Sequence, residues 1–209
     1  MAETDRPGPG PRRAGAANHR HLQRRRPDPA GPQRTSVYWP RHGFGAGDVF
    51  YDIGANIGAY TLYAAKARSV PVVAFEPNPF SYRVLVHNFH LNAITDRVLP
   101  LCLAAGGPGE NGIGLQVLAF RLDDLAAIEG IPAPTHVKID VDGIEAAILE
   151  GAKSLLSGPG VKSVLIEMLT HDDAAQARIT SLLGECGLKP VDLPDDGSDN
   201  RLFTHATRA

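Results

Sequence analysis

Acidic side chains close several short apolar runs of this chain. Asp52, Glu76, Asp140 and Glu167 each end a run that is rich in Val, Ile, Leu, Phe or Ala. Such runs predict buried strands, and open α/β sheets bind ligands at the carboxyl ends of their strands. We therefore expect these carboxylates at one edge of a sheet, where they can accept hydrogen bonds from hydroxyls, take up protons or face a cation.

The first acid lies in a turn whose glycine spacing departs from the dinucleotide-binding pattern. Gly54 and Gly58 are four residues apart, and Ala55-Asn56 stands where G-x-G-x-x-G has its middle glycine. Because glycine has no Cβ, this turn is expected to let a ligand approach the backbone closely. Asp52 would repel a pyrophosphate. The turn favours a cationic ligand such as S-adenosylmethionine, which has a sulfonium, an ammonium and a ribose but no phosphate.

Glu76 is the predicted acceptor for that ribose. It follows Asp52 by 24 residues, close to the spacing of about 20 at which a nucleoside-binding carboxylate follows the first strand of such a unit. A carboxylate there can accept hydrogen bonds from both ribose hydroxyls. Each acid alone is more readily explained as a solvated charge at a strand end, but their order and spacing together favour a nucleoside site.

The segment Lys138–Glu145 is predicted to carry the chemistry. Asp140 should emerge at the carboxyl edge of the sheet, with Asp142 and Glu145 on the turn and first helical turn beyond it. Functional sites often hold several carboxylates close enough together to repel one another. Glu145 has an equally simple alternative role, since acidic side chains stabilise helix N-termini. Lys138 is predicted to be a structural ion-pair partner of these acids rather than a catalytic amine.

Asp140, His171 and Asp142 are the predicted catalytic residues, with Asp140 first. Alkyl transfer from a sulfonium to a hydroxyl needs in-line placement, exclusion of water and an acceptor for the hydroxyl proton. His171 is the alternative general base, although a lone loop histidine is usually just solvated. Asp140 and Glu167 have the oxygen ligands that suit Mg²⁺, but nothing in their spacing demands a metal and none is predicted.

Alternating strands and helices must position these residues. Apolar runs predict strands over residues 48–53, 71–76, 97–103, 135–141 and 161–168, with helices over 58–68, 79–92, 143–157 and 172–186. Asn78 before Pro79 is the expected start of the second helix. This alternation predicts an α/β fold with a mostly parallel sheet. Leu188–Leu193 and Arg201–Thr204, separated by turn-forming residues, predict a C-terminal antiparallel hairpin.

Four segments occur in a distinctive order: Gly47–Thr61, Ala74–Pro79, Arg121–Leu125 and Lys138–Glu145, the last followed by Leu149–Ala152. Together they resemble the FkbM-type family of S-adenosylmethionine-dependent methyltransferases, from about Gly47 to Phe203. The resemblance implies a Rossmann-like class I methyltransferase sandwich that methylates hydroxyls of sugars or natural products. The expected cofactor-binding residues are Asp52, Gly54, Ala55, Asn56, Gly58, Thr61, Glu76, Pro77, Asn78 and Asp140.

Length and composition predict one domain preceded by a leader. The chain has 209 residues, of which 43% are hydrophobic and 21% charged, as in ordinary globular proteins. Residues 1–47 hold nine Arg, no Lys and three acids, a net charge of +6, whereas the remainder carries −8. The Arg/Pro/Gly composition of residues 1–36 predicts disorder. Residues 37–209 are expected to form the methyltransferase domain, with Val37–Trp39 as its first docked segment.

Cellular context follows from a few further features. Cys102 and Cys186 lie in apolar stretches and are expected to be reduced packing residues. No apolar run approaches the roughly 18 residues that a membrane span needs, and no signal-peptide pattern follows Met1. We therefore expect a cytoplasmic protein without membrane partners. The arginine-rich leader could bind nucleic acid, but a disordered leader is the simpler explanation, and no nucleic-acid partner is predicted.

Three classes of function remain open. The leading one is an O-methyltransferase acting on a small-molecule or glycan acceptor. The second is a nicotinamide-dependent oxidoreductase on a similar sheet, which the interrupted glycine pattern and Asp52 disfavour. The third is a truncated, non-catalytic cofactor-binding domain. It is favoured because only a glycine-rich turn and a short run separate Ala104 from Phe120, where the family that the chain resembles has a longer segment over the acceptor.

Overall fold

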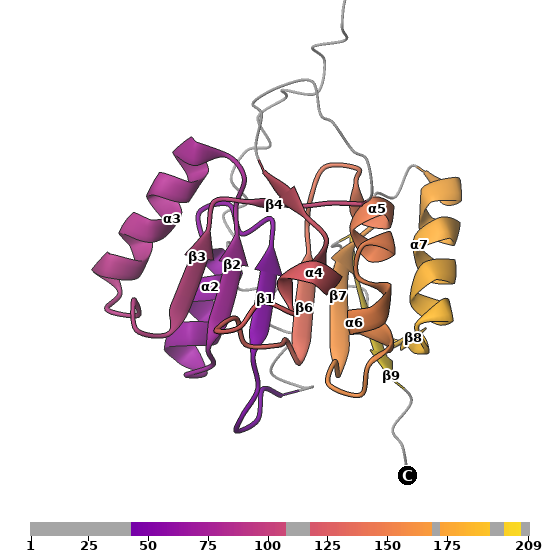
Figure 1. Cartoon of the computed structure of the whole chain (residues 1–209), viewed down its shortest axis with the longest axis horizontal. Coiled ribbons are helices and arrows are strands. Elements are labelled where there is room, and N and C mark those ends of the chain that lie inside the picture. Colours follow the sequence, from indigo (N-terminus) through magenta and orange to yellow (C-terminus); the bar gives the residue numbers. More distant parts are fainter. Residues whose placement is uncertain (1–42, 108–117, 169–171, 193–198, 206–209) are drawn as a thin grey trace, which may run out of the picture. The chain divides into compact units, whose positions relative to one another are not determined.

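The computed structural model describes residues 43–107, 118–168, 172–192 and 199–205. The chain divides into two units, residues 1–31 and 32–209, and every described residue belongs to the second. Seven strands of this unit form one sheet in the order β3-β2-β1-β6-β7-β9-β8 (Figure 1). Their bounds are β1 Phe50–Ile53, β2 Val72–Phe75, β3 Val98–Leu101, β6 His136–Ile139, β7 Ser163–Glu167, β8 Leu188–Pro190 and β9 Asn200–His205.

The strand directions confirm the predicted fold class. Strands β3, β2, β1, β6 and β7 are parallel neighbours. Strand β9 runs antiparallel to both β7 and β8, so β8 and β9 are the expected C-terminal hairpin. The five predicted core strands are all present, each shortened by no more than two residues at either end. A mostly parallel sheet with an antiparallel edge follows from this order.

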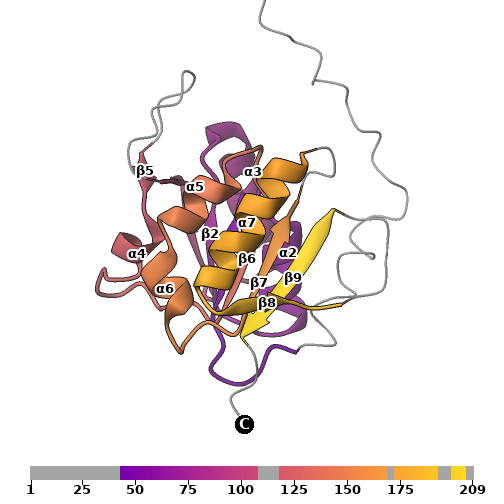
Figure 2. The same ribbon diagram turned by 90° about the vertical axis from the view of Figure 1, so that its right-hand side faces the viewer.

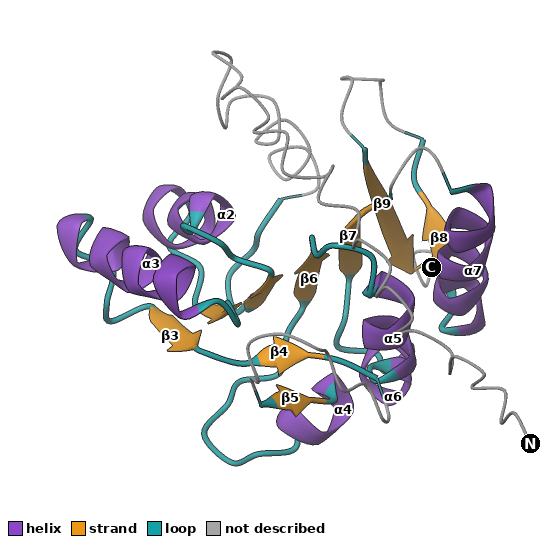
Figure 3. Ribbon diagram, turned by 90° about the horizontal axis from the view of Figure 1, so that it is seen from above, coloured by secondary structure: helices purple, strands orange, loops and turns teal. Residues whose placement is uncertain are grey.

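Alternating side chains build an apolar layer on each face of the sheet. Phe50 and Ala74 belong to the layer under α2 (Ala59–Leu62), the π-helical turn η4 (Tyr63–Ala67) and α3 (Pro79–Leu91). Tyr51 and Ile53 belong to the layer under α4 (Leu122–Leu125), α5 (Glu145–Glu150), α6 (Lys153–Ser157) and α7 (Asp173–Glu185). Figures 2 and 3 show these helix groups on opposite sides of the sheet. Most core strand positions are therefore buried on both faces.

Three of the four predicted helices are found near their expected bounds. The second is α3, where the Asn78 side chain accepts hydrogen bonds from the backbone N–H groups of Phe80 and Ser81 and Pro79 takes the first turn. Predicted helix 58–68 is α2 continued by η4, and predicted helix 172–186 is α7. The capping signal in the sequence was therefore sufficient to locate the start of α3.

The fourth predicted helix, residues 143–157, is in fact two helices, α5 and α6. Gly151 lies at the break, where a Cβ would come 2.5 Å from the carbonyl oxygen of Gly106. The carboxylate of Asp123 accepts hydrogen bonds from two backbone N–H groups at the start of α6, 2.8 and 3.2 Å away. A residue distant in the chain thus sets this helix start, which local periodicity does not show.

Other details of this region also departed from expectation. Helix α4 and the parallel pair of two-residue strands, β4 (Ala104–Ala105) and β5 (Ala119–Phe120), were not predicted. Cys186 is buried as expected, but Cys102 is exposed just after β3, so the prediction that it packs in the core was wrong. Cys102 follows β3, which lies at the sheet edge, whereas the next residues, Leu103 and Ala105, pack against the core.

Some predictions concern parts of the chain outside the described residues. These are the disordered leader 1–36, the docked segment Val37–Trp39, His171, and most of the short segment between Ala104 and Phe120. They stay predictions. Within the described ranges, no helix is both long and apolar enough to cross a membrane.

Candidate functional site

The candidate site lies at the carboxyl edge of the parallel strands, where β1, β2 and β6 end side by side (Figure 1). Gly54 follows β1 with φ of +77°, and a Cβ there would overlap the carbonyl oxygen of Asp140. Gly58 has φ of +92°, and a Cβ there would lie 2.6 Å from the Leu85 side chain of α3. Contacts within the protein therefore require both glycines, in addition to any ligand approach expected from the sequence.

Asp52, Lys138 and Asp140 form one charged cluster at this edge. Asp52 and Lys138 are paired in register across β1 and β6 and are 0% and 2% exposed. Lys138 Nζ lies 3.7 Å from Asp52 Oδ1 and donates a hydrogen bond to Asp140 Oδ2 at 2.8 Å. The predicted ion-pair role of Lys138 is confirmed for Asp140. Thr61, expected at the cofactor, is buried and donates its hydroxyl to Asp52 Oδ2 at 2.6 Å, so it orients that acid.

Glu76 connects the turn after β1 with the turn after β2 through hydrogen bonds. Its Oε2 accepts a hydrogen bond from the backbone N–H of Asn56 and its Oε1 one from that of Asn78, each at 2.8 Å. Asn56 has φ of +49°, in the left-handed region that asparagine tolerates better than most residues. Glu76 is buried. Because an ionised carboxylate has about four acceptor positions, these two bonds leave capacity for a ligand.

The remaining predicted cofactor residues surround this carboxylate. Ala55 is buried, and its N–H donates to the Phe75 carbonyl at 2.9 Å. Pro77 is half-buried, and Asn78 is exposed while its side chain caps α3. The fold thus brings the turn after β1 and the turn after β2 next to each other, as the motifs predicted.

The three carboxylates beyond β6 have different environments. Asp142 is exposed, the Asp140 side chain is 38% exposed, and Glu145 is buried. Burial raises the pKa of Glu145, hydrogen bonds from its own N–H and that of Gly143 counteract this, and the charges of Asp142 and Asp140 raise it further. Glu145 is also the first residue of α5. It therefore combines the two roles that the sequence left open, crowded carboxylate and helix N-terminal acid.

Glu167 and His171 are the other residues that the sequence placed near the site. Glu167 ends β7, the strand next to β6, and is half-buried. His171 lies outside the described residues. Among the residues with a described placement, no group of three or more His, Cys, Asp or Glu is arranged to hold a metal ion.

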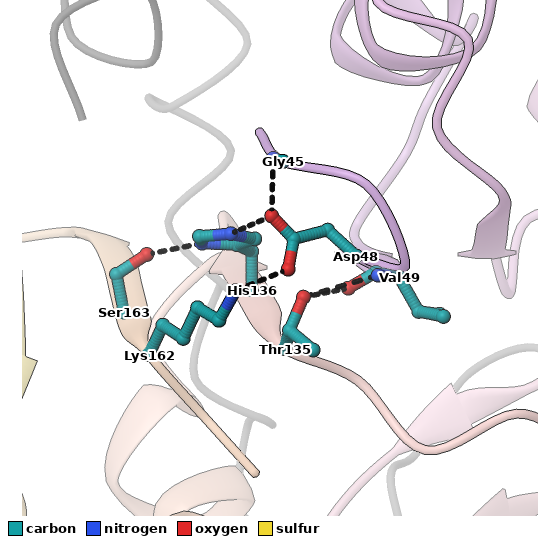
Figure 4. A network of polar contacts seen from close by, with 7 residues as sticks. All are labelled: Gly45, Asp48, Val49, Thr135, His136, Lys162 and Ser163. Atoms are coloured by element: carbon teal, nitrogen blue, oxygen red, sulfur yellow. Dashed lines mark hydrogen bonds and ion pairs between the residues drawn. The ribbon is translucent and has the colours of Figure 1, made fainter. Parts of the chain in front are cut away.

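A second polar cluster lies at the amino edge of the same strands, and sequence reasoning missed it (Figure 4). Asp48 Oδ2 accepts a hydrogen bond from the Gly45 N–H at 2.6 Å and lies 3.1 Å from His136 Nε2. Lys162 Nζ donates to Asp48 Oδ1 at 2.7 Å, and His136 Nδ1 lies 2.7 Å from Ser163 Oγ. Asp48, His136 and Ser163 are buried. Polar residues at strand starts were the available signal, but their pairing depends on sheet order.

The pKa values of this cluster follow from its hydrogen bonds. Burial raises the pKa of Asp48, but hydrogen bonds from Gly45, Lys162 and His136 outweigh that effect and lower it to about 2. Burial lowers the pKa of His136, with partial opposition from Asp48. A neutral His136 can donate from Nε2 to Asp48 and accept at Nδ1 from the Ser163 hydroxyl, so every group in the cluster is used.

Comparison with known proteins places these features in context. No family model matches the sequence. The chain is 27% identical over 157 residues to the hexuronic acid methyltransferase AglP of Haloferax volcanii, covering 68% of this chain and 63% of AglP. It is 27% identical over 209 residues to the 31-O-demethyl-FK506 methyltransferase FkbM of Streptomyces tacrolimicus, covering 75% of this chain and 79% of FkbM.

A third relative has a different kind of substrate in its name. The chain is 28% identical over 169 residues to the tRNA (guanine(37)-N(1))-methyltransferase of Xenopus tropicalis, covering 72% of this chain and 33% of that protein. The chain thus spans less than two thirds of the length of AglP and of this tRNA methyltransferase.

Solved structures share the fold at low sequence identity. TrmK of M. capricolum, in complex with S-adenosyl-homocysteine, matches with a TM-score of 0.52 and 14% identity, over 82% of this chain and 64% of TrmK. A protein of the NADB-Rossmann superfamily from Streptococcus agalactiae matches with a TM-score of 0.56 and 15% identity, over 85% of this chain and 68% of that one. In sequence, the chain resembles the FkbM-type family of S-adenosylmethionine-dependent methyltransferases, and its fold resembles that of TrmK.

Proposed function

We propose that this protein is an S-adenosylmethionine-dependent methyltransferase that methylates a hydroxyl of a sugar or natural-product acceptor. The observation that carries the proposal is the fixed carboxylate of Glu76 at the end of β2. Backbone N–H groups of Asn56 and Asn78 hold its two oxygens, and the remaining acceptor positions suit the two hydroxyls of a ribose. Since Glu76 is already oriented, a nucleoside that binds there meets a smaller ordering cost.

The charge at this edge supports a cationic nucleoside rather than a dinucleotide. Asp52 and Asp140 share the buried ammonium of Lys138, and Asp142 and Glu145 follow Asp140 in the chain. A pyrophosphate would add negative charge to a site rich in carboxylates, whereas a sulfonium and an ammonium are attracted to it. These charges support S-adenosylmethionine and disfavour a nicotinamide dinucleotide.

The protein's own task in methyl transfer is to orient the acceptor, exclude water and receive a proton. S-adenosylmethionine, when bound, supplies a methyl group on a positively charged sulfur that leaves as a neutral thioether. Asp140 is our candidate for the general base that accepts the hydroxyl proton as the new C–O bond forms, because its carboxylate is partly exposed at the carboxyl edge of the sheet. Asp142 and His171 are the alternatives.

The acceptor class has two candidates. The name of AglP, a hexuronic acid methyltransferase, supports a sugar acceptor, and that of the 31-O-demethyl-FK506 methyltransferase supports an oxygen of a natural product. The similarity to a tRNA (guanine(37)-N(1))-methyltransferase supports a transfer RNA. Residues 48–209 carry a net charge of −8, which repels nucleic-acid phosphates, although the +6 of residues 1–47 would attract them. We favour the hydroxyl acceptor because the residues of the proposed site belong to the acidic part of the chain.

Calorimetric titration of the full chain tests the cofactor. We expect S-adenosylhomocysteine to bind and NAD not to bind. At 100 times its Kd, the nucleoside should raise the free energy of unfolding by about 2.7 kcal/mol. Glu76→Gln should weaken binding about tenfold or more, since a hydrogen bond to a charged group contributes about 1.5–3 kcal/mol. Glu129→Gln, at an exposed turn, is the matched control. Preferential binding of NAD, or unchanged binding by Glu76→Gln, would contradict the assignment.

Mass spectrometry of products formed with a labelled methyl donor tests the reaction. The panel contains sugars, natural-product alcohols and tRNA. We expect a hydroxyl product, and we expect Asp140→Asn to lower turnover by about 10²–10⁴ with little change in affinity for S-adenosylhomocysteine. Methylation of tRNA alone would replace the acceptor assignment. Cofactor binding without turnover on any acceptor would favour the non-catalytic alternative.

A further inference from the structure

Lys138 is a buried cation shared by two carboxylates of unequal exposure. Its partner in register, Asp52, is fully buried, whereas the Asp140 side chain is partly open to solvent. Yet Nζ lies 2.8 Å from Asp140 and 3.7 Å from Asp52, and 3.7 Å is too long for a hydrogen bond. The ammonium is thus closer to the exposed acid, although an ion pair is electrostatically stronger in the enclosed position.

Asp52 has room for a second hydrogen bond. Its Oδ2 accepts from Thr61, but within the described part of the chain no group donates a hydrogen bond to its buried Oδ1. A buried carboxylate oxygen without a donor is unfavourable. Movement of Nζ toward Asp52, closing the gap of 3.7 Å, would satisfy this oxygen. The Tyr60 ring, 4.3 Å from Nζ, gives the ammonium a cation–π contact beside both acids.

We propose that Lys138 is a positioning residue that moves from Asp140 toward Asp52 when a positively charged methyl donor binds, and so leaves the charge of Asp140 to the donor. The inference rests on the proposed function. Repulsion between ammonium and sulfonium favours the movement, and Oδ1 of Asp52 receives the displaced ammonium. Once the donor has become a neutral thioether, this repulsion ends, and Lys138 returns to Asp140 when that carboxyl has released to solvent the proton that it took from the acceptor. The site thereby responds to the charge that the reaction removes.

The proposal is tested by a ratio of two affinities measured by calorimetry: the affinity for S-adenosylmethionine divided by the affinity for neutral S-adenosylhomocysteine. Lys138→Met should raise the ratio in favour of the charged donor about tenfold, because no cation then competes for Asp140. Asp52→Asn keeps an acceptor for Thr61 but removes the carboxylate that receives Lys138, so it should lower the ratio about tenfold. Lys138→Arg retains the charge and should stay near the wild-type ratio.

The double variant, Lys138→Met with Asp52→Asn, distinguishes a lysine that moves from charges that stay in place. If Lys138 moves, Asp52→Asn should have little effect on the ratio in a Lys138→Met background. Additive effects would show fixed charges and overturn the proposal, as would unchanged ratios in both single variants. Melting temperatures without ligand verify folding, and Lys138→Gln replaces Lys138→Met if that variant does not fold. A wild-type chain that binds neither nucleoside would overturn the proposed function and this inference together, whereas binding with unchanged ratios overturns the inference alone.

Discussion

Two polar clusters lie at opposite edges of the same parallel strands, and they differ in how completely their groups are paired. His136 and Lys138, two residues apart on β6, each belong to one cluster. At the amino edge, both oxygens of Asp48 and both ring nitrogens of His136 have partners (Figure 4). At the carboxyl edge, Asp52 Oδ1 has no hydrogen-bond donor among the described residues, and Lys138 stands 3.7 Å away from it.

The difference separates a cluster that stabilises the fold from one that can serve a ligand. Buried polar groups are costly unless they are paired, so a closed network such as that of Asp48 gains nothing from a further partner. The carboxyl edge retains acceptor capacity at Glu76, where a bound molecule can complete the pairing, and at the buried Asp52, where Lys138 can complete it. Removal of polar side chains should therefore affect mainly stability at the amino edge and mainly ligand binding at the carboxyl edge.

The largest expected effect comes from the backbone of the carboxyl edge. Gly54→Ala should lower the free energy of unfolding by about 2–5 kcal/mol, from the cost of a left-handed φ and overlap with the Asp140 carbonyl. Gly130→Ala is the control, because Gly130 also has a positive φ, +90°, but no atom within 4 Å of its added Cβ. The free energy of unfolding of Gly130→Ala should fall by only about 1–2 kcal/mol. Equal losses in urea unfolding would show that the strand ends are not closely packed.

The next prediction concerns the pH dependence of stability, which should come from Asp48 at the amino edge. The pKa of Asp48 is lowered from 3.8 to about 2 in the folded chain, which corresponds to about 2 kcal/mol of stability. Since the folded pKa is the lower one, this stability is present above about pH 4 and is lost as the pH falls through 2. Asp48→Asn should therefore be less stable than wild type by about 2 kcal/mol at pH 5, and this difference should shrink toward pH 2 in urea titrations.

Ligand affinity provides the matched comparison. Asp48→Asn should bind S-adenosylhomocysteine as the wild type does, whereas Glu76→Gln should lose affinity. A loss of affinity in Asp48→Asn without a change in stability would reverse the roles assigned to the two edges.

The smallest expected effect is at the end of the closed network. Ser163→Ala removes the buried hydroxyl that hydrogen-bonds with His136 Nδ1, and loss of this bond should lower the free energy of unfolding by about 1–2 kcal/mol. Cofactor affinity should not change. Thermal unfolding measures the loss, and Thr180→Ala on the exposed side of α7 is a control for hydroxyl removal. A Ser163→Ala variant as stable as wild type would show that the network is not closed through this bond.

Sequence patterns predicted most of the fold because most of its signals are local. The apolar runs located all five parallel core strands, and Asn78 with Pro79 located the start of α3. The prediction of one helix over residues 143–157 was wrong because Asp123, far away in the chain, caps α6. Helix α4 and the short β4/β5 pair were missed since elements of two to four residues carry too little periodicity to detect.

The sequence by itself determined which acids close the core strands, and hence that Asp52, Glu76 and Asp140 would meet at one edge. Tertiary structure alone decided how each is used. The order of the strands places Lys138 next to Asp52, gives Glu76 a backbone donor from the turn after β1, and encloses His136 with Asp48 and Ser163. Spacing along a chain specifies where a strand ends, but hydrogen-bond partners depend on which strands become neighbours, and long-range packing of the two helix layers sets that order.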